Sequence, residues 1–232
     1  MKKFLLIIFC FFSLNSFAQK PKVKNNPEYD YKRLHFGFTL GLNIMDFKVY
    51  HSGENYNIDS LYVDVSQLTP GFHIQIVSNL RVSEYFDLRF LPGISFGQRY
   101  LQYIHDSVEI AKMKMESSFL EFPLLLKYKS KRLNNFRPYL IGGFNGRIDM
   151  AARKEYDERE GIHIQLKPFD LYYEVGFGID FYLPYFKFSI ELKAAFGMRN
   201  VLVPDADPAE PQYTTSIDRL NSTLVLLSFN FE

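Results

Sequence analysis

The chain has 232 residues, of which 47% are hydrophobic and 17% aromatic, and its 27 basic and 26 acidic residues give a net charge of +1 at pH 7. This balance argues against general nucleic-acid binding, which needs a basic excess. The length suits one domain, and the single cysteine, Cys10, excludes a disulfide framework.

The first 18 residues have the layout of a secretory signal peptide. Two lysines come first, an unbroken apolar run covers 4–12, and small residues then occupy the two positions that a signal peptidase reads. We predict cleavage between Ala18 and Gln19. The apolar run is too short for a spanning helix, which needs about 20 residues. The polar, lysine-rich segment 19–33 is predicted to be a flexible periplasmic arm.

From residue 34 onward, apolar and polar residues alternate along eight segments. The pattern is clearest in 186–199, and the 137–150 segment is the least regular because glycines interrupt it. A strand projects successive side chains to opposite faces, so each segment has one apolar face. At about 12 to 15 residues most exceed a soluble strand and suit a tilted membrane strand of about 9–11 residues. The segments are 34–47, 71–82, 86–100, 118–129, 137–150, 170–183, 186–199 and 220–231.

The connections alternate in length. Short turns at 83–85, 130–136 and 184–185 alternate with longer polar stretches, including one over 101–117. Short periplasmic turns and longer external loops are typical of outer-membrane barrels, and closure satisfies every backbone hydrogen bond. We predict an all-β, eight-stranded antiparallel up-and-down transmembrane β-barrel over 34–232, in a Gram-negative outer membrane. The alternative is a soluble lipocalin-like barrel or sandwich with its apolar face inside.

Charged residues of both signs recur on the predicted inner face. The interior of an eight-stranded barrel is just wide enough for side chains to fill, so we expect a salt-bridged structural plug. The alternative interpretation is an ion or proton pathway. The predicted lumen charge network consists of Arg81, Arg89, Glu121, Lys127, Glu174, Asp180, Lys187, Glu191 and Lys193.

Motifs for chemistry are missing from the sequence. It has no phosphate-binding loop, nucleotide fingerprint or nucleophile motif, and no two histidines at metal-ligand spacing. We therefore predict no catalytic residue, no cofactor, no metal and no small-molecule substrate, and so no enzyme. An enzyme with a site at the outer rim stays as a minor alternative.

Two stretches resemble known families. LEFPLLLKY at 120–128, followed by RPYL at 137–140, resembles the widespread Bacteroidetes family of outer-membrane β-barrel domains. More specifically, YD at 29–30 followed by HFGFTLGLN at 35–43 and MDF at 45–47 is similar to the PorT family, called SprT in gliding species. The resemblance covers essentially the whole mature chain.

The resemblance implies a role required for, or accessory to, type IX protein secretion, and gliding motility where cells glide. It implies partners among the other secretion components, besides outer-membrane lipid, and no catalytic residues. A barrel of this size is too narrow to pass a folded secreted protein. A structural or adhesion barrel without a secretion role is the main alternative.

Overall fold

The computed structural model describes residues 23–51, 61–64, 68–105, 108–153, 164–204, 214 and 216–232. The predicted signal peptide and its cleavage site lie outside these residues. The 3-10 helices η1 (Pro27–Tyr31) and η3 (Ala151–Arg153) are short, and no helix in the described part is long and apolar enough to cross a membrane. The strands are β1 (Leu34–His51), β2 (Leu61–Asp64), β3 (Pro70–Arg81), β4 (Phe86–Phe90), β5 (Gly93–His105), β6 (Val108–Lys129), β7 (Phe136–Asp149), β8 (Phe169–Tyr182), β9 (Lys187–Gly197) and β10 (Ile217–Phe231).

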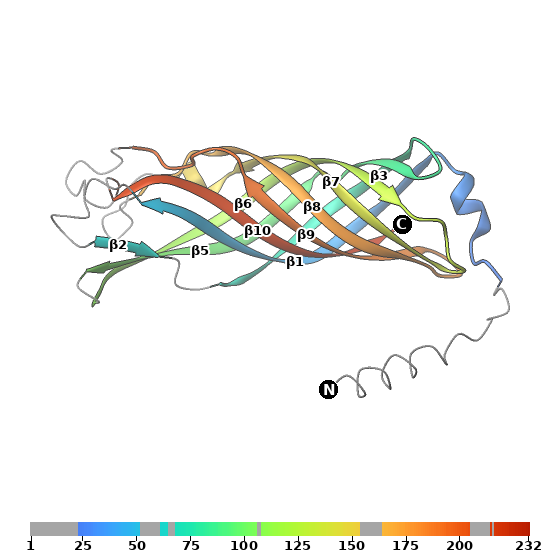
Figure 1. Ribbon diagram of the computed structural model, residues 1–232, viewed down its shortest axis with the longest axis horizontal. Helices are drawn as coiled ribbons and strands as arrows, with labels where there is room; N and C mark the ends of the chain where they lie inside the picture. The colour runs from blue at the N-terminus through green and yellow to red at the C-terminus, as the bar shows by residue number, and fades with distance from the viewer. Residues whose placement is uncertain are drawn as a thin grey trace, which may run out of the picture.

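The strands close into a single antiparallel ring (Figure 1). Strand β1 pairs with β10 along one edge and with β3 along the other, so the sheet has no open edge in this wall. Strands β4 and β5 act as one strand interrupted at Leu91-Pro92, since both pair with β3 and with β6. Strand β2 pairs with β5 beyond the end of β3. The ring therefore has eight strands, which confirms the predicted fold.

The two faces of the wall have the chemistry of a membrane barrel. Phe36 and Phe177, on the outer face, are 67% and 57% exposed, whereas the inward Thr39 and Arg89 are fully buried. A soluble barrel or sandwich would bury the apolar face instead. The lipid-facing assignment of the alternating segments follows directly from this exposure.

The outer end of the barrel differs from the sequence prediction. Within the stretch 101–117, expected to be a loop, residues 101–105 and 108–117 instead continue β5 and β6 as a paired extension. The inward side chains there are apolar, and they pack together with residues of β1, β2 and β10. This outer cluster consists of Phe47, Val63, Leu101, Tyr103, Met113, Met115, Ile164, Leu166, Val201, Leu202, Ile217 and Leu220. Burial of these side chains stabilises the extended strands outside the bilayer.

In β1 the chemistry of the two faces inverts at the outer boundary while the direction of the side chains is unchanged. In β1, Asn43 faces inward and Ile44 outward; farther along, Phe47 faces inward and Lys48 outward. A polar interior with an apolar exterior thus becomes an apolar interior with a polar exterior. The inversion marks where the wall leaves the hydrocarbon layer.

Candidate functional site: the charged lumen and its periplasmic mouth

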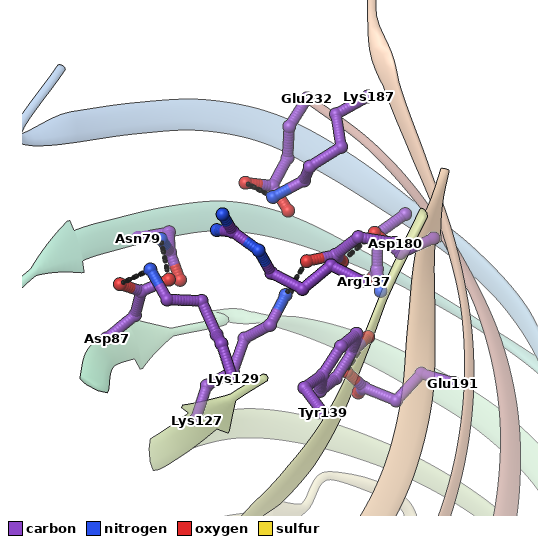
Figure 2. Close-up of polar contacts among 12 residues, drawn as sticks. Asn79, Asp87, Lys127, Lys129, Arg137, Tyr139, Asp180, Lys187, Glu191 and Glu232 are labelled. Atoms are coloured by element: carbon purple, nitrogen blue, oxygen red, sulfur yellow. Dashed lines mark hydrogen bonds and ion pairs between the residues drawn. The ribbon is translucent and has the colours of Figure 1, made fainter. Parts of the chain in front are cut away.

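The periplasmic half of the lumen is crossed by buried ion pairs (Figure 2). The Lys127 Nζ donates to both carboxylate oxygens of Asp180 at 2.8 Å, and the Ser189 hydroxyl donates to the same carboxylate at 2.7 Å. The Lys127 ammonium also lies 3.6 Å from the centre of the Tyr139 ring. Three strands, β6, β8 and β9, are joined by this one cluster.

Glu191 on β9 organises a second cluster. It accepts from Arg89 at 3.2 Å and from the Tyr139 hydroxyl at 2.8 Å, and it lies 3.3 Å from the Lys193 Nζ. Tyr139 on β7 reaches over Gly178 on β8 to Glu191 on β9, because the glycine leaves room for its ring. A Cβ at Gly178 would lie 2.5 Å from the Tyr139 hydroxyl. Any residue larger than glycine would therefore displace the Tyr139 ring.

A third cluster fills the middle of the lumen around Arg147. Its guanidinium lies 3.1 Å from Glu174 and 3.3 Å from Glu121. Glu121 also accepts from Gln75 at 2.8 Å, and Asn145 donates to Glu174 at 2.6 Å. Each buried carboxylate thus has several donors, which is the condition under which buried charge is tolerated.

The structure brings together eight of the nine residues chosen from the sequence, with Arg81 as the exception. The Arg81 side chain lies partly exposed at the periplasmic rim, where its Nε donates to the Ser83 carbonyl at 3.4 Å. Whether the network is purely structural stays a prediction.

Sequence reasoning missed several members of the network. Lys129 lies 2.5 Å from Asp87, and Arg99 lies 2.7 Å from Asp149. All four sit on inward positions of their strands, as does Arg147, so strict alternation could have found them. In β7, glycines interrupt the alternation around Arg147. Arg99 lies directly before the stretch 101–117, which the sequence predicts to be a loop.

The last residue, Glu232, is also part of the network. Its carboxylate accepts from Arg89 at 2.9 Å and from Lys187 at 2.8 Å. Burial alone would raise the pKa of this carboxyl, but the positive charges of Lys187 and Arg89 outweigh burial and hold the pKa well below its usual range. The chain end therefore lies inside the barrel mouth as an anion.

The N-terminal segment closes the periplasmic mouth. Helix η1 places the Tyr29 ring 3.8 Å from the His35 ring in a stacked arrangement, and the Tyr29 hydroxyl donates to Glu232 at 2.7 Å. Burial, together with the nearby Glu232 charge, raises the pKa of the Tyr29 phenol, so this donor stays protonated. Asp30 lies 3.2 Å from Arg132 and 3.1 Å from Arg137, in the β6–β7 turn and in β7.

Within the predicted arm 19–33, Asn25, Tyr29 and Asp30 thus contact the barrel, whereas the flexibility of the arm stays a prediction. Arg132 also donates to the carbonyl of Asn25, and the Asn25 side chain donates to the Tyr182 carbonyl at 3.0 Å. An aromatic ring and a paired carboxylate fix the segment. Neither signal stands out in a lysine-rich sequence, because the partners other than His35 lie more than 100 residues away.

Little free space remains at the mouth. A cavity of about 10 Å³ lies between Tyr29, Asp87, Lys129 and Lys187, which is about the size of one water molecule. No group of three or more acidic, histidine or cysteine side chains with metal-binding geometry occurs in the described part of the chain. The outer cluster fills the opposite end.

The comparisons agree with this architecture. The family model described as "Outer membrane protein beta-barrel domain" matches residues 17–203. The chain belongs to this family. Its location is therefore the outer membrane, with the apolar wall in contact with lipid. No curated protein matches the sequence.

Several solved outer-membrane proteins are similar to this chain. OprG from Pseudomonas aeruginosa is 13% identical with a TM-score of 0.50, over 86% of this chain and 94% of that chain. Neisserial surface protein A is 9% identical with a TM-score of 0.42, over 86% and 98%. Ail of Yersinia pestis is 10% identical with a TM-score of 0.35, also over 86% and 98%. At such identities the likeness concerns the fold alone.

Proposed function

We propose that this outer-membrane barrel is a non-enzymatic protein required for, or accessory to, type IX secretion, and gliding motility where cells glide. The specific support is the resemblance of 35–43 and 45–47 to the PorT family. The observation that carries the mechanism is the filled lumen: ion pairs occupy its membrane part, apolar side chains its outer end, and Tyr29 its periplasmic mouth. A barrel filled in this way acts through its surfaces.

The partners are proteins of the secretion machine in the same membrane or just beneath it. Two regions outside the barrel wall are the proposed contact regions: the N-terminal segment 19–33 and the connection 149–167 between β7 and β8, whose residues Asp149, Ile164 and Leu166 are themselves packed against the barrel. In the N-terminal segment, Lys24, Tyr31 and Lys32 are exposed beside the docked η1 helix. The centre of the connection lies outside the described residues.

Deletion of the gene is the decisive test. Loss of secreted enzyme activity, and of gliding in a gliding species, supports the proposal, provided that re-expression of the parent chain restores both. Intact secretion in the deletion strain contradicts it. That result would favour a structural or adhesion barrel, for which the paired outer extension of β5 and β6 offers an external surface.

A further inference from the structure

Four exposed cations lie together at the outer rim, and none of them forms an ion pair within the described residues. They are Lys48 on β1, Lys167 just before β8, Arg199 just after β9 and Arg219 on β10, here called the outer cationic strip. None of them lies within 4.0 Å of a carboxylate in the described residues. The fully buried cations of the lumen, in contrast, are ion-paired.

Two members of the strip share one aromatic ring. The Lys48 Nζ lies 5.1 Å from the centre of the Tyr50 ring, and the Arg219 Cζ lies 6.0 Å from the same centre. Register explains this arrangement, because Tyr50 on β1 stands opposite Arg219 on β10. The two positive charges therefore face the same space outside the wall.

The other two members continue the strip across the end of β9. The Arg219 guanidinium donates to the carbonyl of Met198 at 2.9 Å, next to Arg199. The Lys167 Nζ donates to the carbonyl of Asn200 at 3.3 Å. These contacts place the four cations along one arc of the rim.

The strip lies just beyond the lipid-facing band. On the outer surface, Ile44 stands opposite Val225 and both are apolar and exposed, whereas Lys48 stands opposite Asn221. Four residues of strand at about 3.4 Å each, tilted by about 40°, place Lys48 about 10 Å beyond Ile44 along the membrane normal. This is the level of the lipid headgroups.

We propose that the outer cationic strip binds the phosphate groups of a phosphorylated lipid in the outer leaflet. Unpaired Lys and Arg side chains attract anionic headgroups, and the Arg guanidinium matches phosphate geometry with two parallel hydrogen bonds. The nearby carboxylates offset only part of the charge: Asp170 is buried, accepts the Arg199 backbone N–H at 3.2 Å and interacts electrostatically with the Arg199 side chain. Asp46 on β1 is half-buried and accepts the Phe47 backbone N–H, and Asp218 is a single exposed acid. The inference does not depend on a role in secretion.

The test uses the complete mature barrel in neutral detergent micelles, titrated with diphosphorylated lipid A, with bound lipid counted by native mass spectrometry. Each neutralised cation is expected to weaken binding about fivefold, so Lys48→Gln/Arg199→Gln/Arg219→Gln should weaken it by roughly 100-fold. Lys48→Gln alone, which removes no backbone contact, should weaken it about fivefold. The affinity should fall as NaCl is raised.

A charge-matched control variant separates location from total charge. In Lys112→Gln/Lys114→Gln/Lys131→Gln, two changes lie on the outer face of β6 and one at a periplasmic turn; Lys114 is already 3.6 Å from Glu116. This variant should bind lipid A like the parent. The parent and the strip variant should bind dephosphorylated lipid A with the same affinity.

Four results would overturn the proposal. They are equal lipid A binding by the parent and the strip variant, equal loss in the control variant, equal binding of dephosphorylated lipid A, or inorganic phosphate binding as tightly as lipid A. A fifth concerns the acidic residues Asp205, Asp207 and Glu210, which lie outside the described residues. If the variant Asp205→Asn/Asp207→Asn/Glu210→Gln binds lipid A and the parent does not, the acidic residues of the parent chain occupy the outer cationic strip.

Discussion

Breaking the Lys127–Asp180 pair should destabilise the barrel far more than replacing both partners. The two side chains are 0% and 1% exposed, and Lys127 bonds both carboxylate oxygens. Removing one partner from such a pair leaves a buried charge uncompensated and costs about 3–5 kcal/mol. We expect this loss for Lys127→Met.

The double variant Lys127→Met/Asp180→Leu removes both charges. Its main remaining defect is the Ser189 hydroxyl, which loses its acceptor, at a cost of about 1–3 kcal/mol. The double variant should therefore be more stable than Lys127→Met. The difference measures how much of the loss comes from unpaired charge rather than from lost packing.

Urea unfolding of the barrel in lipid vesicles, followed by circular dichroism because the chain has no tryptophan, measures these free energies. The exposed pair Lys114–Glu116 is the control, and Lys114→Gln should change stability by about 0–1 kcal/mol. Two results would refute the reasoning: Lys127→Met as stable as the parent, or a double variant less stable than Lys127→Met.

Four further predictions concern the wall, the lumen, the chain end and the surfaces. Phe177→Arg should lower the stability of the inserted barrel by about 2–4 kcal/mol near the midplane, measured by heat-modifiable gel migration, and insertion equal to that of Phe177→Leu would mean that the faces are assigned wrongly. The purified barrel in a planar bilayer should show no large steady channel, because side chains fill its interior; conductance on the scale of a general porin contradicts this. The pKa of Glu232 is lower in the folded than in the unfolded chain, so its stabilisation is present above the ordinary carboxyl pKa and is lost as the pH falls toward the folded value; Glu232→Gln should flatten this acid dependence in unfolding curves, and an unchanged acid transition contradicts it. Deleting 20–28, or replacing 152–161 with a Gly/Ser linker, should leave the barrel level normal and reduce secretion, whereas two variants that secrete like the parent would place recognition on the barrel wall.

The sequence by itself determined the wall of this protein. Alternation has a period of two, and the same period governs how strand side chains point, so residues such as Phe36 and Thr39 could be assigned to opposite faces from the sequence. Long segments and short turns then fixed the number of strands and their antiparallel order. The charged positions on the inner face followed from the same parity.

Only the tertiary structure decided the two ends of the barrel. The alternation shifts phase in β1 between Ile44 and Phe47, but this shift by itself does not show that the strand continues, because the apolar face beyond it needs a protein core that other segments supply. The extension of β5 and β6 therefore depends on packing of Leu101 and Met113 against residues far along the chain. At the other end, Tyr29 and Glu232 are separated by 203 positions and meet only because ring closure brings both chain ends to one mouth.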